Sequence, residues 1–242
     1  MEENRVTERR PESELGPADW VVAGVRAFGA GVGSLVPVGF EAYARVFHPA
    51  GAPTGDDVSW ASVAEACKTV FHPGAEWGSL VGGWNRAENH DHEQLWVDEP
   101  ESGSLPPRQA EGLSRVLANF TSTPEQCWFA LWEGWSDLPP SWDSAPRVAM
   151  PQRPMLLFAA PLRAAAESLA DSAWFRSASL WWPQDRVWCV ATDVDLMTTY
   201  VGGSRACIDA IRSDDRLEAL EVSVEQQVTW KTDTVNPLPE SP

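Results

Sequence analysis

The sequence predicts a single α+β domain in which a central mixed or antiparallel sheet packs against three to four helices. Three observations lead to this fold class. The chain of 242 residues is 43% hydrophobic, which is enough to build one sizeable core. Several short segments are apolar on both faces, as strands in the middle of a sheet are. Helical segments separate them without a regular alternation of strand and helix, which favours α+β over a doubly wound fold.

Both ends of the chain are expected to lie outside the folded domain. Residues 1–17 are rich in charge and poor in apolar side chains, which is typical of a disordered tail. Residues 231–242 are rich in proline and predict a second, loose tail. The folded α+β domain is therefore expected to span residues 18–230.

The first half of the domain predicts a hairpin and two helices. Residues 20–25 and 35–47 have strand character, and the glycine-rich segment between them predicts a hairpin turn. Residues 59–70 repeat apolar side chains at helical spacing, with Asp57 or Ser59 as the cap at the start, and residues 104–120 show the clearest helical pattern of the chain. The stretch between these helices, residues 76–103, predicts a long irregular segment that holds Trp77, Trp84 and Trp96. Such segments tend to be functional or mobile.

The second half predicts most of the sheet. Residues 126–132 and 155–160 are apolar on both faces, which indicates strands inside a sheet. A helix is expected over residues 162–170, and another follows Gly202-Gly203 with Ser204 as its cap. Shorter strands are expected over residues 179–182, 186–192, 198–201 and 217–224.

Composition narrows the possible partners. Lys and Arg total 18 against 35 Asp and Glu, and the formal charge of -17 disfavours nucleic acid and anionic lipid as partners. No apolar run approaches the roughly 20 residues that a membrane helix needs, and the N-terminal residues lack the apolar segment of a secretory signal. We therefore expect a cytoplasmic protein without a cofactor. Its four separated cysteines predict reduced thiols rather than disulfides or a zinc site.

Several segments together resemble a known set of sequences. They are TPEQCWFALWEGW (123–135), SLWWP (179–183), RVWCVAT (186–192), YVGGS (200–204) and the His-Pro pairs at 48–49 and 72–73. With these motifs the chain resembles a family of hypothetical proteins of high-GC actinobacteria over most of residues 19–225. The resemblance implies a bacterial intracellular protein, and it carries over no activity, ligand or functional residue.

Fourteen tryptophans are the most unusual feature of the composition, and some lie where predicted strands end. Trp132, Glu133 and Trp135 follow the strand at 126–132, and Asp193 and Asp195 follow the strand at 186–192. If both strands end at the same side of the sheet, these residues and Trp182 form one aromatic, acidic pocket suited to a cation, a sugar or a basic peptide. Plain core packing of the tryptophans is the competing interpretation.

The leading functional hypothesis is a non-catalytic or accessory binding protein that recognises an unknown partner protein or small ligand through this pocket. The alternative is a divalent-metal-dependent enzyme that uses Asp193 and Asp195 with His90 and His92. For the metal site, the competing interpretation is a strand end and a solvated loop. A carbohydrate-binding module is a third possibility. Whether the protein is an enzyme stays open, because no nucleophile motif is present.

Overall fold

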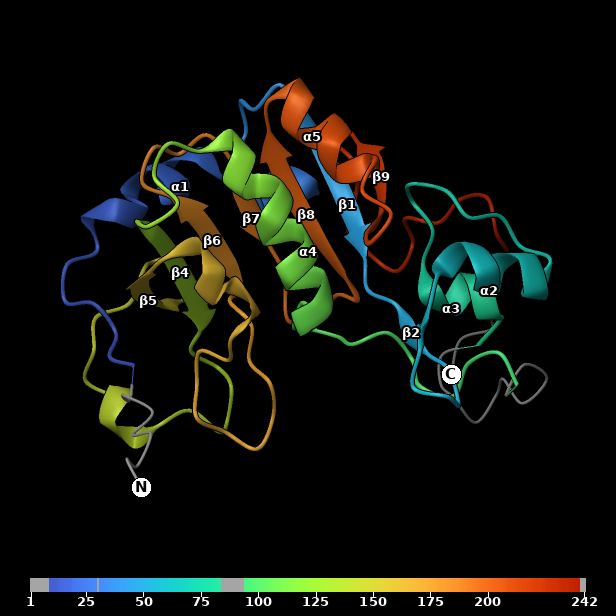
Figure 1. Cartoon of the computed structure of the whole chain (residues 1–242), viewed down its shortest axis with the longest axis horizontal. Coiled ribbons are helices and arrows are strands. Elements are labelled where there is room, and N and C mark those ends of the chain that lie inside the picture. Colours follow the sequence, from blue (N-terminus) through green and yellow to red (C-terminus); the bar gives the residue numbers. More distant parts are fainter. Residues whose placement is uncertain (1–8, 30, 84–93, 240–242) are drawn as a thin grey trace.

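A seven-stranded antiparallel sheet forms the centre of the described part of the protein, which is residues 9–29, 31–83 and 94–239 of a computed structural model (Figure 1). The strand order is β5-β4-β6-β7-β8-β1-β9, and the predicted α+β class with a central sheet and packed helices is confirmed. The sheet strands are β1 (Ala42–Phe47), β4 (Cys127–Trp132), β5 (Met155–Ala160), β6 (Leu180–Pro183), β7 (Cys189–Ala191), β8 (Thr198–Gly203) and β9 (Glu218–Val222). A small separate pair is formed by β2 (Ala50–Gly51) and β3 (Asp57–Val58).

Short helices connect and cover these strands. The α-helices are α1 (Asp19–Gly24), α2 (Trp60–Cys67), α3 (Trp77–Val81), α4 (Pro107–Leu117) and α5 (Arg205–Arg212). The 3-10 helices are η1 (Gly16–Ala18), η2 (Val32–Ser34), η5 (Ala118–Phe120), η6 (Pro140–Trp142) and η7 (Leu162–Ala166).

Helices α4 and α5 cover one face of the sheet (Figure 1). Helix α4 begins at Pro107, whose fixed φ suits a first helical turn, and it buries Leu113 and Leu117. Helix α5 begins after Ser204, whose side chain accepts a hydrogen bond from the backbone N–H of Cys207 at 3.2 Å. Both helices are amphipathic, so each buries its apolar stripe against the sheet, and both predictions are confirmed.

The N-terminal segment covers the opposite face, where the sequence predicted a hairpin. Residues 19–24 form helix α1 rather than a strand, and β1 is limited to the last six residues of the predicted strand 35–47. Gly31 explains why no hairpin turn forms. Its φ is 88°, and a Cβ atom there would lie 2.5 Å from the backbone oxygen of Gln226. The glycine therefore lets this segment lie directly against the chain that follows β9, to which Val32 N–H donates at 2.9 Å.

The segment just inside the N-terminus is docked on the domain, which corrects the predicted tail for residues 9–17. The Glu12 N–H donates to the Leu157 oxygen on edge strand β5 at 2.7 Å, and the Arg9 oxygen accepts a hydrogen bond from the Trp142 indole. Leu15 packs against the buried cluster on this face. Composition did not predict this docking. Backbone hydrogen bonds to a sheet edge do not require a repeating pattern of apolar side chains, so the sequence carries no sign of them.

The C-terminal segment is also anchored, which corrects the predicted loose tail for residues 231–239. Asp233 and Asn236 are buried, at 2% and 8% exposure. From β9 the chain crosses to a second, smaller cluster of helices α2 and α3, as the red segment in Figure 1 shows. The cluster is built around Phe47 and three tryptophans whose rings meet in series, namely Trp60, Trp77 and Trp96. We call it the satellite cluster.

Candidate functional site

The two strand ends that the sequence analysis selected do open on the same side of the sheet. Strands β4 and β7 are not direct neighbours, because β6 lies between them. Since β6 is antiparallel to both, β4 and β7 run in the same direction. Glu133 and Asp193 therefore leave the sheet at the same end, as the predicted site requires.

Arg153 fills the space between these two strand exits. Its Nε donates to Asp193 Oδ2 at 3.2 Å, and its Nη2 donates to Asp195 Oδ2 at 2.7 Å. Its guanidinium carbon lies 5.4 Å from the centre of the Trp132 ring and 4.9 Å from that of Phe28. The predicted combination of aromatic and acidic groups is present, and the protein's own arginine supplies its cation.

The remaining residues of the exits hold arginines in the same way. Glu133 accepts a hydrogen bond from Arg147 Nε at 2.7 Å. The Trp135 ring lies 3.9 Å from the guanidinium carbon of Arg176, which also pairs with Asp137 at 3.0 Å. These contacts hold together the loops that leave β4 and β5. The aromatic and acidic residues of the exits therefore bind the protein's own arginines, and we call this arrangement the internal clamp.

Trp182 does not lie with the other five predicted residues. It pairs in register with Trp128, near the start of β4, whereas the exit lies beyond Trp132. Its side chain is fully buried and meets Trp20 of α1 edge-on, with ring centres 6.2 Å apart. The prediction that Trp182 lines an open pocket is wrong because the N-terminal segment covers this face of the sheet. Its neighbour Trp181 points to the other face and is buried there as well.

A cavity of about 200 Å³ lies beside the exits, between the sheet and the satellite cluster. We call it the tryptophan pocket. Three tryptophans line it, and so do one arginine and three carboxylates. They are Trp60, Trp77, Trp230, Arg45, Glu76, Glu99 and Asp195. Asp195 is thus the one residue of the predicted site that also belongs to this cavity.

The tryptophans of the pocket are held by caps and by one another. Ser59 caps α2 by accepting the Ser62 N–H at 3.1 Å, as predicted, and this places Trp60 at the first helical position. The Trp60 indole donates to the His48 oxygen at 2.7 Å, and its ring centre lies 5.3 Å from that of Trp77. The buried indole nitrogen of Trp77 has no hydrogen-bond acceptor among the described residues.

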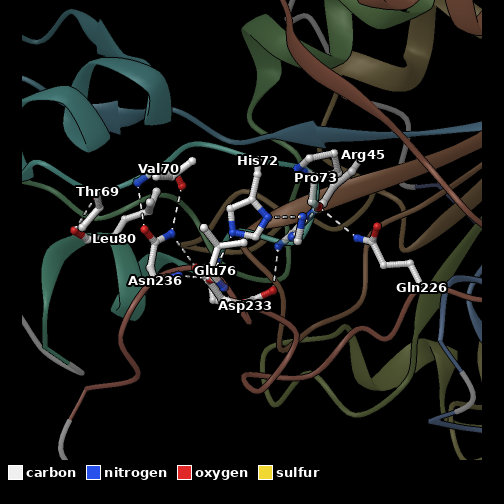
Figure 2. A network of polar contacts seen from close by, with 12 residues as sticks. Arg45, Thr69, Val70, His72, Pro73, Glu76, Leu80, Gln226, Asp233 and Asn236 are labelled. Atoms are coloured by element: carbon white, nitrogen blue, oxygen red, sulfur yellow. Dashed lines mark hydrogen bonds and ion pairs between the residues drawn. The ribbon is translucent and has the colours of Figure 1, made fainter.

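Arg45 is the buried cation of the pocket, with 2% of its side chain exposed. Its Nη2 donates to Glu76 Oε1 at 3.0 Å, and its Nη1 donates to the Pro73 oxygen at 3.1 Å (Figure 2). Its guanidinium carbon also lies within 5.9 Å of the centre of the Trp60 ring. Burial raises the pKa of Glu76, and the neighbouring Arg45 charge opposes this rise. The pair is therefore desolvated and costly to break.

The C-terminal segment lies next to this pair and is anchored there by hydrogen bonds of Asp233 and Asn236. Asp233 accepts a hydrogen bond from His72 Nε2 at 2.9 Å and another from the Asn236 side chain at 2.9 Å (Figure 2). Asn236 in turn exchanges two hydrogen bonds with the backbone of Val70. Burial disfavours the Asp233 carboxylate, but the hydrogen bonds from Asn236 and His72 outweigh it and hold its pKa below the usual value.

His48 is a buried structural residue. A carbonyl can only accept, so its Nδ1 donates to the Glu101 oxygen at 2.6 Å, and its Nε2 accepts from Thr199 Oγ1 at 2.9 Å. Burial lowers its pKa to about 4, so the ring is neutral at pH 7. Both ring nitrogens are engaged, so His48 serves to hold β1, β8 and the Glu101 loop together.

The cysteines are free thiols in the described chain, as the sequence predicted. Burial raises the pKa of Cys127 and of Cys207 to about 12, and it raises the pKa of Cys67 and of Cys189 as well. Thiols with raised pKa values are poor nucleophiles at neutral pH.

The residues of the alternative metal site are only partly described. His90 and His92 lie outside the described residues. Asp193 and Asp195 both pair with Arg153. Within residues 9–29, 31–83 and 94–239, no three His, Cys, Asp or Glu side chains are grouped so as to hold a metal ion.

A larger cavity, of about 800 Å³, lies where the N-terminal segment meets η6 and the loop after η7. Its lining includes Arg9 and Glu167, which form an ion pair, and Asp137, which pairs with Arg176. The tryptophan pocket is the better candidate because its aromatic walls are packed against one another. In the sequence, only the irregular segment 76–103 and Asp195 pointed to it, because Arg45, Trp60 and Trp230 come from separate parts of the chain.

Comparisons with known proteins assign no family to the chain. Searches of protein-family models, curated proteins and solved structures each found no significant match. In the part of the chain that the structure describes, none of the helices combines the length and the apolar character needed to cross a membrane.

Proposed function

We propose that this protein is a non-catalytic binding protein that receives part of a partner protein or small ligand in the tryptophan pocket. The observation that carries the proposal is the pocket itself. Three indole rings and three carboxylates line about 200 Å³ of open space, next to strand exits whose aromatic and acidic groups hold the protein's own arginines. A concave aromatic wall with a few polar groups is the usual form of a recognition site.

The walls of the pocket support binding without rearrangement. Trp60 is fixed by its indole hydrogen bond, and Trp77 is packed between Trp60 and Trp96 at ring-centre distances of 5.3 and 5.1 Å. Arg45 is held by three hydrogen bonds from its own guanidinium. A preformed pocket loses little conformational entropy on binding, so more of the contact energy is available for affinity.

A fragment screen tests the proposal. Small aromatic, cationic, anionic and sugar-like compounds are added to the protein, and binding is measured by NMR or calorimetry. We expect at least one class to bind with a Kd of about 1 mM or tighter. Trp230→Ala should weaken that binding about tenfold, because Trp230 is 48% exposed and its removal takes away a wall rather than a core side chain.

Trp174→Ala is the matched control, because Trp174 is 67% exposed and lies outside the pocket. Equal loss of binding in both variants would contradict the proposal. So would a screen in which no compound class binds the native protein.

A further inference from the structure

We infer that the group received by the tryptophan pocket is the guanidinium of an arginine side chain on a partner polypeptide. The inference rests on the proposed function and specifies its ligand. Four observations support it: the size of the pocket, the sign of its charge, the way this protein holds its own cations, and an unpartnered indole N–H.

The size of the pocket suits one side chain. Its volume of about 200 Å³ is below the roughly 300 to 1,000 Å³ of pockets that hold drug-sized ligands. It is somewhat larger than the ~150 Å³ of an engineered cavity that binds benzene. An arginine side chain has about as many heavy atoms as benzene, arranged in a longer shape. The pocket is therefore too small for a dinucleotide or an oligosaccharide and large enough for a single guanidinium with its stem.

The charge of the pocket favours a cation. Three carboxylates, those of Glu76, Glu99 and Asp195, line it, against two guanidinium groups: that of Arg45, and that of Arg153, which pairs with Asp195 at 2.7 Å. Glu76 engages Arg45 through Oε1 alone, and 20% of the Glu76 side chain stays exposed. Its second oxygen can therefore accept a hydrogen bond from an entering group. The whole chain, at -17, also attracts cationic segments over a distance.

The protein already uses tryptophan rings and carboxylates to hold arginines. Arg153 lies over Trp132 with Asp193 as its partner, and Arg176 lies over Trp135. A planar guanidinium can stack on a ring while its edge donates to a carboxylate, and an ammonium group cannot do both in this way. The tryptophan pocket offers the same two kinds of surface with space left between them.

The rim of the pocket already holds a weaker cation. The Lys231 ammonium lies 4.6 Å from the centre of the Trp230 ring. Lys231 is exposed, so it can leave the ring at little cost when another cation arrives. An entering guanidinium would compete with Lys231 for this ring.

The indole N–H of Trp77 indicates that the ligand also brings an acceptor. Trp77 is 5% exposed, lines the pocket and has no acceptor for this N–H among the described residues. This nitrogen is itself buried, and a buried donor without a partner is unfavourable, so a carbonyl oxygen that comes within reach of it would add affinity. A polypeptide carries such an oxygen next to every arginine side chain, which favours a peptide over a free amine.

Calorimetric titration with four blocked tripeptides tests the inference. The peptides are acetyl-Gly-X-Gly-amide with X as arginine, lysine, citrulline or glutamate, where citrulline keeps the shape of arginine without its charge. We expect the arginine peptide to bind most tightly, the citrulline peptide about tenfold more weakly, and the glutamate peptide not at all.

Three variants locate the site. Glu76→Gln and Trp77→Phe should each weaken binding of the arginine peptide about three- to tenfold, by removing the acceptor charge and the indole donor. Lys231→Met should strengthen it about twofold, because the competing cation is gone. Glu125→Gln is the matched control, because the Glu125 carboxylate is exposed and does not line the pocket. It should leave the affinity for the arginine peptide unchanged.

The outcomes separate this inference from the proposed function. Equal affinity for arginine and citrulline, or arginine binding that all three variants leave unchanged, overturns the inference. If no tripeptide binds but a neutral or anionic fragment does, and Trp230→Ala weakens it, the inference falls and the proposed function stands. If neither peptides nor fragments bind, both fall.

Discussion

The strand exits and the tryptophan pocket are built from the same kinds of residue, and they differ in what fills them. At the exits, Trp132 and Asp193 surround Arg153, which comes from the loop before β5. In the pocket, Arg45 occupies only one side, and about 200 Å³ stays open beside Trp77. An aromatic and acidic composition therefore predicts that a cation is bound. It does not predict whether that cation is the protein's own arginine or comes from a partner.

Removing the internal arginine from the pocket should have the largest effect on stability. In Arg45→Met, Glu76 loses its partner in a buried setting, and we expect a loss of about 3–5 kcal/mol in the free energy of unfolding. Urea denaturation measures it. Arg115→Met is the control, because the ion pair of Arg115 with Glu111 is exposed and should contribute less than about 0.5 kcal/mol. A loss below about 1 kcal/mol in Arg45→Met would show that the pair does not organise the pocket.

Acidification should weaken the same region through His48. Its pKa is about 4 in the folded protein and 6.5 ordinarily, so between these values the unfolded chain binds more protons. Stability is therefore complete above pH 6.5 and falls as the pH drops toward 4, by about 3 kcal/mol in all. Denaturation at several pH values measures it. In His48→Gln the loss over this window should be smaller by that amount, and an identical profile would show that His48 is not the group responsible.

Loss of the C-terminal anchor should cost somewhat less. Asp233→Ala removes the acceptor of His72 and Asn236, and we expect a destabilisation of about 2 kcal/mol, since hydrogen bonds to a charged group are among the stronger ones. Thr234→Ala, at the exposed position next to it, should change stability by less than about 0.5 kcal/mol. Equal melting temperatures for the two variants would mean that residues 231–239 do not hold the pocket in place.

Removing the internal arginine from the exits should have the smallest effect. Arg153→Gln removes two ion pairs, of which the one with Asp193 is partly buried, and two ring contacts, for an expected loss of about 1–2 kcal/mol. It should also leave an aromatic, acidic site that takes up the arginine tripeptide weakly, as a second binding event in calorimetry. If Arg153→Gln still shows a single binding event, the exits do not share the chemistry of the pocket.

The sequence predicted the sheet and its main helices because their signals are local. The strand at 126–132, the helix at 104–120 and the caps Ser59 and Ser204 are each set by neighbouring side chains. The predicted hairpin failed because Gly31 serves a contact with Gln226, almost two hundred residues away in sequence. Local patterns carry no information about such contacts.

The candidate site was predicted only in part for the same reason. Trp132, Glu133, Asp193 and Asp195 do lie at one end of the sheet, because β6 is antiparallel to both β4 and β7, and the sequence analysis could state this only as a condition. The arginines that these carboxylates bind are 14 to 42 residues away in the sequence, so the local pattern did not show that the clamp is filled. The pocket residues Arg45, Trp60 and Trp230 are joined only by the fold, and Trp182 was misplaced because nothing local shows that the N-terminal segment covers it.

The most direct test of the account follows the tryptophan side chains one by one while a ligand is added. Isotope-labelled indole N–H signals, assigned with single Trp→Phe variants, are recorded during titration with acetyl-Gly-Arg-Gly-amide. We expect the Trp77 and Trp230 signals to shift with the bound fraction, whereas those of Trp132 and Trp135, whose rings hold Arg153 and Arg176, stay in place. Shifts at Trp132 and Trp135 with none at Trp77 and Trp230 would contradict it.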